Sequence, residues 1–328
     1  MKPPTTAPTT LTARTPEDLL ALVPYVLGFR PEQSMVMLTF GADQPTFHAR
    51  VDLPDAPDDL ADMVACLLDP VRRHRVPRAV LIAYGDDPGP SAEALHALGA
   101  ALVAEGVDVV EMLRVSGNRW YPMLGGADDL ADGIVYDERS HPFAAQAVLD
   151  GRVTHDSRDD LVDSLVGTDL VAIEAVESAI LEAAVRRGRF DPVAEARWVQ
   201  QVVVTHIEDE TPLTAAEAGR LVVACQDRDL RDVAWGLMSR ETAAAHVDLW
   251  RDLVRRTRDD LQLVPAALLA FAAWLTGSGA LAWCALDRAA LIDPDYGMVR
   301  LLGQALEQAL PPAAWEPVNA LPALLDGA

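Results

Sequence analysis

The sequence predicts an α/β domain, in which helices flank a mixed sheet, followed by an all-α C-terminal domain. Three observations predict this fold class. Short apolar stretches typical of strands alternate with helical patterns in the first half of the chain. After about residue 125, helical periodicity replaces the β pattern almost completely. The length of 328 residues also suits about two domains of roughly 150 residues each.

The chain opens with a Thr- and Pro-rich stretch, residues 1–14, which we expect to form a flexible arm. A helix should begin directly after it. Thr15 suits the N-cap, Pro16 suits the first helical position, and acidic residues follow in the first turn. Gly28 is placed to close this helix in a left-handed conformation.

The sheet should be assembled from a hairpin and a crossover. Strands 34–40 and 46–53 are separated by a turn-rich segment, which favours an antiparallel hairpin. Helices at about 58–74 and 91–105 then alternate with further strands, and strand–helix–strand spacing favours a right-handed parallel crossover. The further strands expected in this half are 79–84, 107–115 and 119–123, with a weak signal at 133–136.

The second half should be entirely helical. Helical patterns are present at 142–149, 159–166, 170–187, 192–207, 215–225, 230–239 and 241–257, and they continue to the C-terminus. We therefore place an α/β domain at 15–155 and a helical domain at 156–328.

One segment of the helical half has the spacing of a tetratricopeptide-like helix pair. Leu269, Gly277, Ala282, Ala289 and Pro294 carry this pattern. No second copy follows at a 34-residue offset, and one such unit cannot build a solenoid. The pattern therefore predicts a single pair of helices that approach closely through small residues.

The charge balance argues against two classes of partner. The chain has 50 acidic and 27 basic residues, a net charge of −23 and a pI near 4.5, so neither nucleic acid nor an anionic membrane surface is an expected partner. Three arginine clusters, 72–75, 186–189 and 255–258, coincide with predicted helix ends, where cations are favoured. A phosphate or nucleic-acid site at one of them is the alternative.

No secretory signal pattern is present at the N-terminus, and the longest apolar run, 264–275, is too short to cross a bilayer. A cytoplasmic protein is therefore expected. The cysteines lie far apart in apolar contexts, which predicts buried thiols, and no zinc-ligand spacing is present. Lys2 is the only lysine, so no P-loop exists, and G-x-S-x-G is absent. We predict no catalytic residue and no metal site, and leave the cofactor open.

The best candidate for a ligand site lies at the carboxyl ends of the two expected parallel strands. Loops at such ends line the ligand crevice of open α/β sheets. Asp86 follows the first of these strands, and Asn118, Arg119 and Trp120 follow the second, so we expect them to converge. Arg119 offers a fork for an anion and Trp120 a stacking face. The alternative is an ion pair between Arg119 and an Asp, with Trp120 half-buried against a helix.

A second candidate is the turn 28–34. Gly28 and Pro31 account for its shape, and Arg30 and Ser34 are its candidate ligand-facing residues.

Four stretches together resemble a known family. They are LLALVPYVLGFRPEQSMVML (19–38), the pair Arg119-Trp120, SHPFAAQAVLDGR (140–152) and GSGALAWCALDRAALIDPDYGMVRLL (277–302). The chain resembles the actinobacterial domain-of-unknown-function family 4192 over nearly its whole length after the arm. The resemblance implies an actinobacterial cytoplasmic protein, and it assigns no activity and no catalytic residue.

Three hypotheses for function remain. The leading one is a binding or scaffold protein with a site for a small anionic ligand or a partner on the α/β domain. The alternative is an enzyme of unknown reaction, a hydrolase or a nucleotide-modifying enzyme, in which Asp86 serves as base or metal ligand and Arg119 holds an anion. The third is a homo-oligomeric structural protein.

Overall fold

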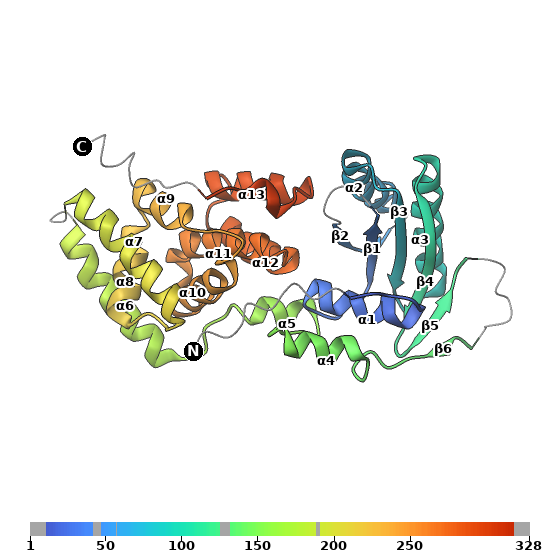
Figure 1. Cartoon of the computed structure of the whole chain (residues 1–328), viewed down its shortest axis with the longest axis horizontal. Coiled ribbons are helices and arrows are strands. Elements are labelled where there is room, and N and C mark those ends of the chain that lie inside the picture. Colours follow the sequence, from blue (N-terminus) through green and yellow to red (C-terminus); the bar gives the residue numbers. More distant parts are fainter. Residues whose placement is uncertain (1–10, 42–46, 57, 125–131, 188–190, 318–328) are drawn as a thin grey trace. The chain divides into compact units, whose positions relative to one another are not determined.

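The structure, a computed structural model, describes residues 11–41, 47–56, 58–124, 132–187 and 191–317. Most of the expected N-terminal arm lies outside these residues. The chain forms two compact units, Met1–Arg158 and Asp159–Ala328, called unit 1 and unit 2 below (Figure 1).

Unit 1 contains a six-stranded mixed sheet with the order β2-β1-β3-β4-β5-β6. Its strands are β1 (Ser34–Phe40), β2 (His48–Asp52), β3 (Arg78–Tyr84), β4 (Asp108–Ser116), β5 (Arg119–Pro122) and β6 (Ile134–Val135). Only β3 and β4 pair in parallel, and the other neighbours are antiparallel. The predicted hairpin, crossover and mixed sheet are confirmed.

Successive strand residues point to opposite sides of the sheet, and apolar side chains occupy both sides. Helices therefore cover both faces. Helix α1 (Pro16–Leu27) covers one face, where Leu20 packs with Val36 and Ile82. Helices α2 (Asp59–His74) and α3 (Pro88–Ala104) cover the other face, where Leu98 packs among buried residues that include Leu81. We call these the α1 face and the α3 face.

The ends of the helices follow from their capping residues. Thr15 and Asp18 form a capping box at the start of α1, and Gly28 closes it with φ +79°. Helix α3 begins at Pro88, three residues earlier than the sequence predicted. The prolines of this segment indicated a loop, but Pro suits a first helical turn, and the Asp87 side chain accepts from Gly89 N–H to cap it.

Two short helices, α4 (Pro142–Leu149) and α5 (Arg158–Asp163), follow the sheet. The boundary between the units falls after the first residue of α5, and further helices with two 3₁₀ turns form the rest of unit 2. They are α6 (Leu170–Arg186), α7 (Pro192–Asp209), α8 (Ala215–Ala224), α9 (Arg228–Gly236), α10 (Ala243–Arg256), η2 (Asp259–Leu261), α11 (Leu263–Leu275), α12 (Gly279–Ile292), α13 (Gly297–Glu307) and η3 (Pro312–Ala314).

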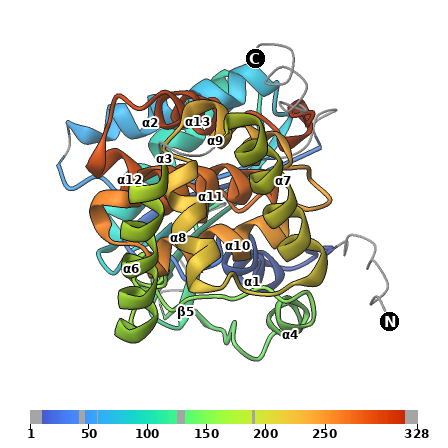
Figure 2. The same ribbon diagram turned by 90° about the vertical axis from the view of Figure 1, so that its left-hand side faces the viewer.

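Helix α11 is the core of unit 2, since every residue from Val264 to Leu275 is buried. Figure 2 looks onto unit 2 and shows α6, α8 and α10 around it. The expected helix pair is α11 and α12, which pack against each other, and Ala282 and Ala289 of α12 are fully buried. Gly277 allows the tight turn between them with φ +79°.

The arginine clusters end helices, as predicted. Arg72 and Arg73 lie in the last turn of α2, Arg186 ends α6, and Arg255 and Arg256 end α10. Arg189 lies outside the described residues.

The three cysteines form no disulfide. The expectation of buried thiols is correct for Cys225 and Cys284 and wrong for Cys66, because Cys66 falls on the outer side of α2. Among the described helices, none combines the length and the apolar character needed to traverse a bilayer.

Candidate functional site

The predicted site residues come from one edge of the sheet in unit 1. The parallel strands β3 and β4 end together, with Tyr84 beside Val115, and β1 begins at this edge with Ser34 beside Tyr84. Strand β5 also begins here, with Arg119 opposite Ser116. We call this the carboxyl edge.

Trp120 and Arg119 lie on opposite faces of this edge. Trp120 stands opposite Val115 and packs on the α1 face, where it is 6% exposed and its Nε1–H donates to Glu17 Oε1 at 3.2 Å. Arg119, one residue earlier on the strand, points to the α3 face. The expected convergence of all four residues therefore does not occur, and Trp120 offers no stacking surface beside Arg119.

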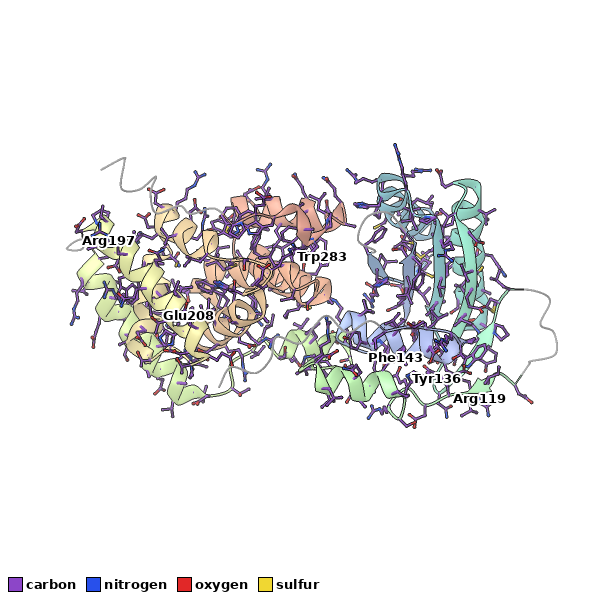
Figure 3. All side chains as sticks on the ribbon, viewed as in Figure 1. Arg119, Tyr136, Phe143, Arg197, Glu208 and Trp283 are labelled. Carbon is purple, nitrogen blue, oxygen red and sulfur yellow. The ribbon has the colours of Figure 1, made fainter. Side chains whose placement is uncertain are left out.

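Arg119 joins β5 to the residues that lead into β6. Its Nη1–H donates to the carbonyl oxygens of Asp132 at 2.7 Å and Gly133 at 3.2 Å. Within the described part of the chain, Arg119 has no ion pair with a carboxylate. The sequence suggested an Asp carboxylate as the partner of Arg119, and in the structure two backbone carbonyl groups take that place instead. Arg119, the first residue of β5, is labelled in Figure 3.

Asp86 and Asn118 do lie at the carboxyl edge. The Asp86 carboxylate accepts from Ser116 Oγ–H at 2.9 Å, so the loop after β3 is joined to the end of β4. Asn118 is exposed, and its carbonyl oxygen accepts from Tyr136 N–H at 3.0 Å. The nearby N-terminus of α3 is a poor anion site, because Pro88 and Pro90 lack N–H groups and the Gly89 N–H is bound by Asp87.

The strongest charged feature of this edge is Arg114, which the sequence analysis missed. Arg114 is 8% exposed and points to the α3 face beside Tyr121, its partner across the strands. Its guanidinium carbon lies 3.9 Å from the centre of the Tyr121 ring, and Nη1 lies 3.5 Å from the Gly85 carbonyl oxygen. Among the described residues, no carboxylate forms an ion pair with it.

A buried cation without a counter-charge is costly, and a cation–π contact offsets only part of that cost. The other N–H donors of Arg114 have no protein partner among the described residues, yet they are not sealed from solvent. A sequence signal for this residue exists. Arg114 is the one basic residue in a strand, VVEMLRV, whose second half is otherwise apolar.

The second candidate, Arg30, holds a remote segment in place. Its Nε–H donates to Glu138 and its Nη1–H to Asp156, both at 2.5 Å, and Asp156 also pairs with Arg139. Burial raises the pKa of the Glu138 carboxyl, and the Arg30 charge partly opposes that rise. The backbone N–H of Arg30 also donates to the His155 carbonyl oxygen. Its guanidinium is therefore already occupied by carboxylates.

Ser34 is likewise engaged within the protein. Its hydroxyl donates to the Glu32 carbonyl oxygen at 2.5 Å and accepts from Arg50 Nε–H at 2.8 Å. Ser34 alternates with Met35 and thus lies on the α1 face with its neighbour Tyr84. The buried Tyr84 hydroxyl has no hydrogen-bond partner among the described residues, and burial raises its pKa. Ser34 is therefore not brought together with Asp86 and Arg119.

The described residues contain no group of three or more His, Cys, Asp or Glu side chains arranged to hold a metal ion. What the geometry defines is a two-unit protein whose mixed α/β sheet carries a polar carboxyl edge and whose second unit is helical.

The chain belongs to the family described as a domain of unknown function (DUF4192), whose model matches residues 16–313. No curated protein and no solved structure matches the chain.

Proposed function

We propose that unit 1 is a binding module for a small ligand that carries an anionic group, and that Arg114 receives that group on the α3 face of the carboxyl edge. The observation that carries the proposal is the buried Arg114 guanidinium without a carboxylate partner among the described residues. An anion would supply the missing counter-charge in a poorly hydrated place, where charge-assisted hydrogen bonds are strong.

The residues around Arg114 support this role. Ser116 lies two residues further along the same face of β4, and Arg119 is its partner on β5. A ligand bound by Arg114 would therefore lie close to Ser116, whose single O–H already donates to Asp86, and would have Arg119 at the rim as a second cation. The Asp86 carboxylate borders the same edge, which favours a ligand with one compact anionic group over a highly charged one.

An enzyme that uses Asp86 as its base has weaker support. The Asp86 carboxylate is already engaged by Ser116 Oγ–H at 2.9 Å. Binding, with the chain serving as a ligand-holding or scaffold protein, is therefore the function that we propose.

Titration calorimetry with inorganic phosphate tests the proposal on the full chain, at an ionic strength held constant with chloride. Arg114→Met should weaken phosphate binding by about tenfold or more, because hydrogen bonds to charged groups contribute about 1.5–3 kcal/mol. Arg78→Met is the matched control, since Arg78 is exposed at the opposite end of β3 and loses the same charge. Equal phosphate affinity in the two variants would refute the proposal.

Scanning calorimetry without phosphate separates binding from a structural role. If Arg114 serves binding, Arg114→Met should unfold at an unchanged or higher temperature, because an apolar side chain of similar length replaces a buried, uncompensated cation. A clear fall in the unfolding temperature would instead assign Arg114 to stacking on Tyr121, against the proposal.

A further inference from the structure

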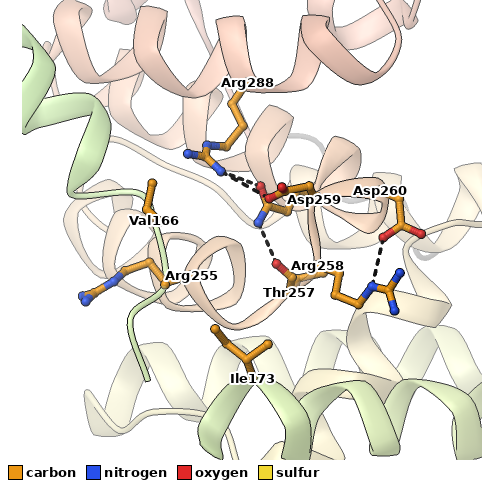
Figure 4. A pocket seen from close by; sticks show the side chains of 10 residues that line it. Val166, Ile173, Arg255, Thr257, Arg258, Asp259, Asp260 and Arg288 are labelled. Carbon is orange, nitrogen blue, oxygen red and sulfur yellow. Dashed lines mark hydrogen bonds and ion pairs between the residues drawn. The ribbon is translucent and has the colours of Figure 1, made fainter. Parts of the chain in front are cut away.

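Unit 2 contains a pocket of about 620 Å³, a size that suits a small organic molecule. It lies where the end of α10 and the turn η2 meet Arg288 of α12 and the residues that lead into α6 (Figure 4). The pocket belongs to unit 2 alone, so it is separate from the anion site that we propose for unit 1.

A buried glutamine organises the polar wall of this pocket. Gln262 is 4% exposed, and its Nε2–H₂ group donates to the carbonyl oxygens of Val254 at 2.9 Å and Thr257 at 2.6 Å. These bonds satisfy carbonyl groups at the C-terminal end of α10. Because both N–H groups are used, Oε1 is left to accept from Arg288 Nη1–H at 2.8 Å.

Arg288 is therefore held in position while most of its donors stay available. Its side chain is 18% exposed, and Gln262 is its one hydrogen-bond partner among the described residues. The nearest carboxylate, Asp259, lies 3.8 Å away with a side chain that is 96% exposed. An ion pair that is this long and this exposed contributes little to stability, so the carboxylate of a ligand can take the place of Asp259 beside Arg288.

The other walls narrow the class of ligand. Arg258 is already paired with Glu177 at 2.6 Å and with Asp260 at 3.5 Å. The Arg255 guanidinium extends away from Arg288 (Figure 4). Val166 and Ile173 supply apolar surface. One positioned cation, acidic groups at the rim and an apolar wall together favour a single negative charge attached to an apolar body.

We infer that this pocket binds a monocarboxylate with a short apolar chain or ring. Its carboxylate takes the free donors of Arg288 in the planar geometry that a guanidinium offers, and its apolar part lies against Val166 and Ile173. The fixed Gln262–Arg288 bond orients the guanidinium before the ligand arrives, which lowers the entropic cost of binding.

Hexanoate, acetate and inorganic phosphate are suitable probes, titrated into the full chain that carries Arg114→Met to remove the unit 1 anion site. Binding is read from the side-chain Nε–Hε resonance of Arg288. We expect hexanoate to bind about tenfold more tightly than acetate, because methylene groups are buried, and more tightly than phosphate. Adding Arg288→Met should weaken hexanoate binding, measured by calorimetry, about tenfold, whereas Arg300→Met, which removes an exposed arginine of α13, should leave it unchanged.

Val166→Asn keeps Arg288 intact and tests the apolar wall separately, so the inference can be tested even if Arg288→Met folds poorly. This variant should lose most of the advantage of hexanoate over acetate. Three results would each overturn the inference: equal affinity for hexanoate and acetate, phosphate binding as tight as hexanoate, or the same hexanoate affinity after Arg288→Met as after Arg300→Met.

Discussion

Gly219 on α8 should be one of the least replaceable residues of unit 2. A Cβ atom at this position would lie 2.6 Å from Ala179 Cβ and 2.7 Å from the backbone of Ala179 and Ile180 on α6. Cβ contacts below 3.0 Å essentially never occur, so Gly219→Ala requires α6 and α8 to move apart by at least 0.4 Å, the difference between 3.0 and 2.6 Å. Their close approach depends on this missing side chain.

The change in stability expected for Gly219→Ala is the difference between two opposing effects. Overpacking a well-packed interface costs about 1–3 kcal/mol, and removing a glycine from a helix interior returns about 0.5–1 kcal/mol. We therefore expect Gly219→Ala to destabilise unit 2 by about 1–2 kcal/mol. For a unit of this size, that lowers the unfolding temperature by about 2–8 °C.

Gly303→Ala on α13 is the matched control. The nearest atom to its added Cβ would be Leu286 Cδ2 at 3.7 Å, an ordinary contact, so only the gain in helix propensity remains. Its unfolding temperature should rise by about 1–4 °C. Tryptophan fluorescence reports on unit 2, because six of the seven tryptophans belong to it. If both substitutions shift the temperature in the same direction, the reasoning from close approach is refuted.

Two further predictions concern a buried histidine and the candidate edge. His246 is 1% exposed, and burial lowers its pKa from 6.5 to about 4. Neutral His246 is thus favoured in the folded state, and the protein should lose about 2–3 kcal/mol between pH 7 and pH 4.5 that His246→Gln does not lose. Urea midpoints at the two pH values measure this difference, and identical losses would contradict it. Arg119→Met should speed amide exchange at Val135 and Tyr136, because the Arg119 bonds to Asp132 and Gly133 are lost. Unchanged exchange would show that these bonds do not hold β6.

The fold could be predicted from the sequence because its signals are local. Alternation of period two, helical periodicity and caps such as Thr15 each act over a few residues, and they agree with one another. The order of the strands could not be predicted from such local signals. Strand β1 lies between β2 and β3, and that arrangement depends on contacts across the sheet. The start of α3 was predicted too late because Pro88 and Pro90 suit a loop as well as a first helical turn.

The candidate site could be predicted only in outline. The parallel pairing of β3 and β4 was correctly predicted, and it is this pairing that brings the loops after both strands to one edge of the sheet. The alternation rule already implies that Arg119 and Trp120, as neighbours on a strand, point to opposite faces. The partners of Arg30 could not be foreseen in the same way, because Glu138 and Asp156 lie 108 and 126 residues away in the sequence.

The acidic composition gives the weakly paired arginines their significance. A chain with a net charge of −23 repels anions at long range, so an anion is retained only where a nearby cation acts at low effective dielectric. With carboxylates in such excess, many arginines take one as a partner, as Arg30, Arg72 and Arg258 do. Arg114 has no such partner among the described residues, and Arg288 has only a distant, exposed one. Each is instead held by a neutral neighbour, the Tyr121 ring or the Gln262 amide, which positions the guanidinium without neutralising it. That arrangement leaves the positive charge available for a ligand, and it is the physical reason for locating a binding site at each of them.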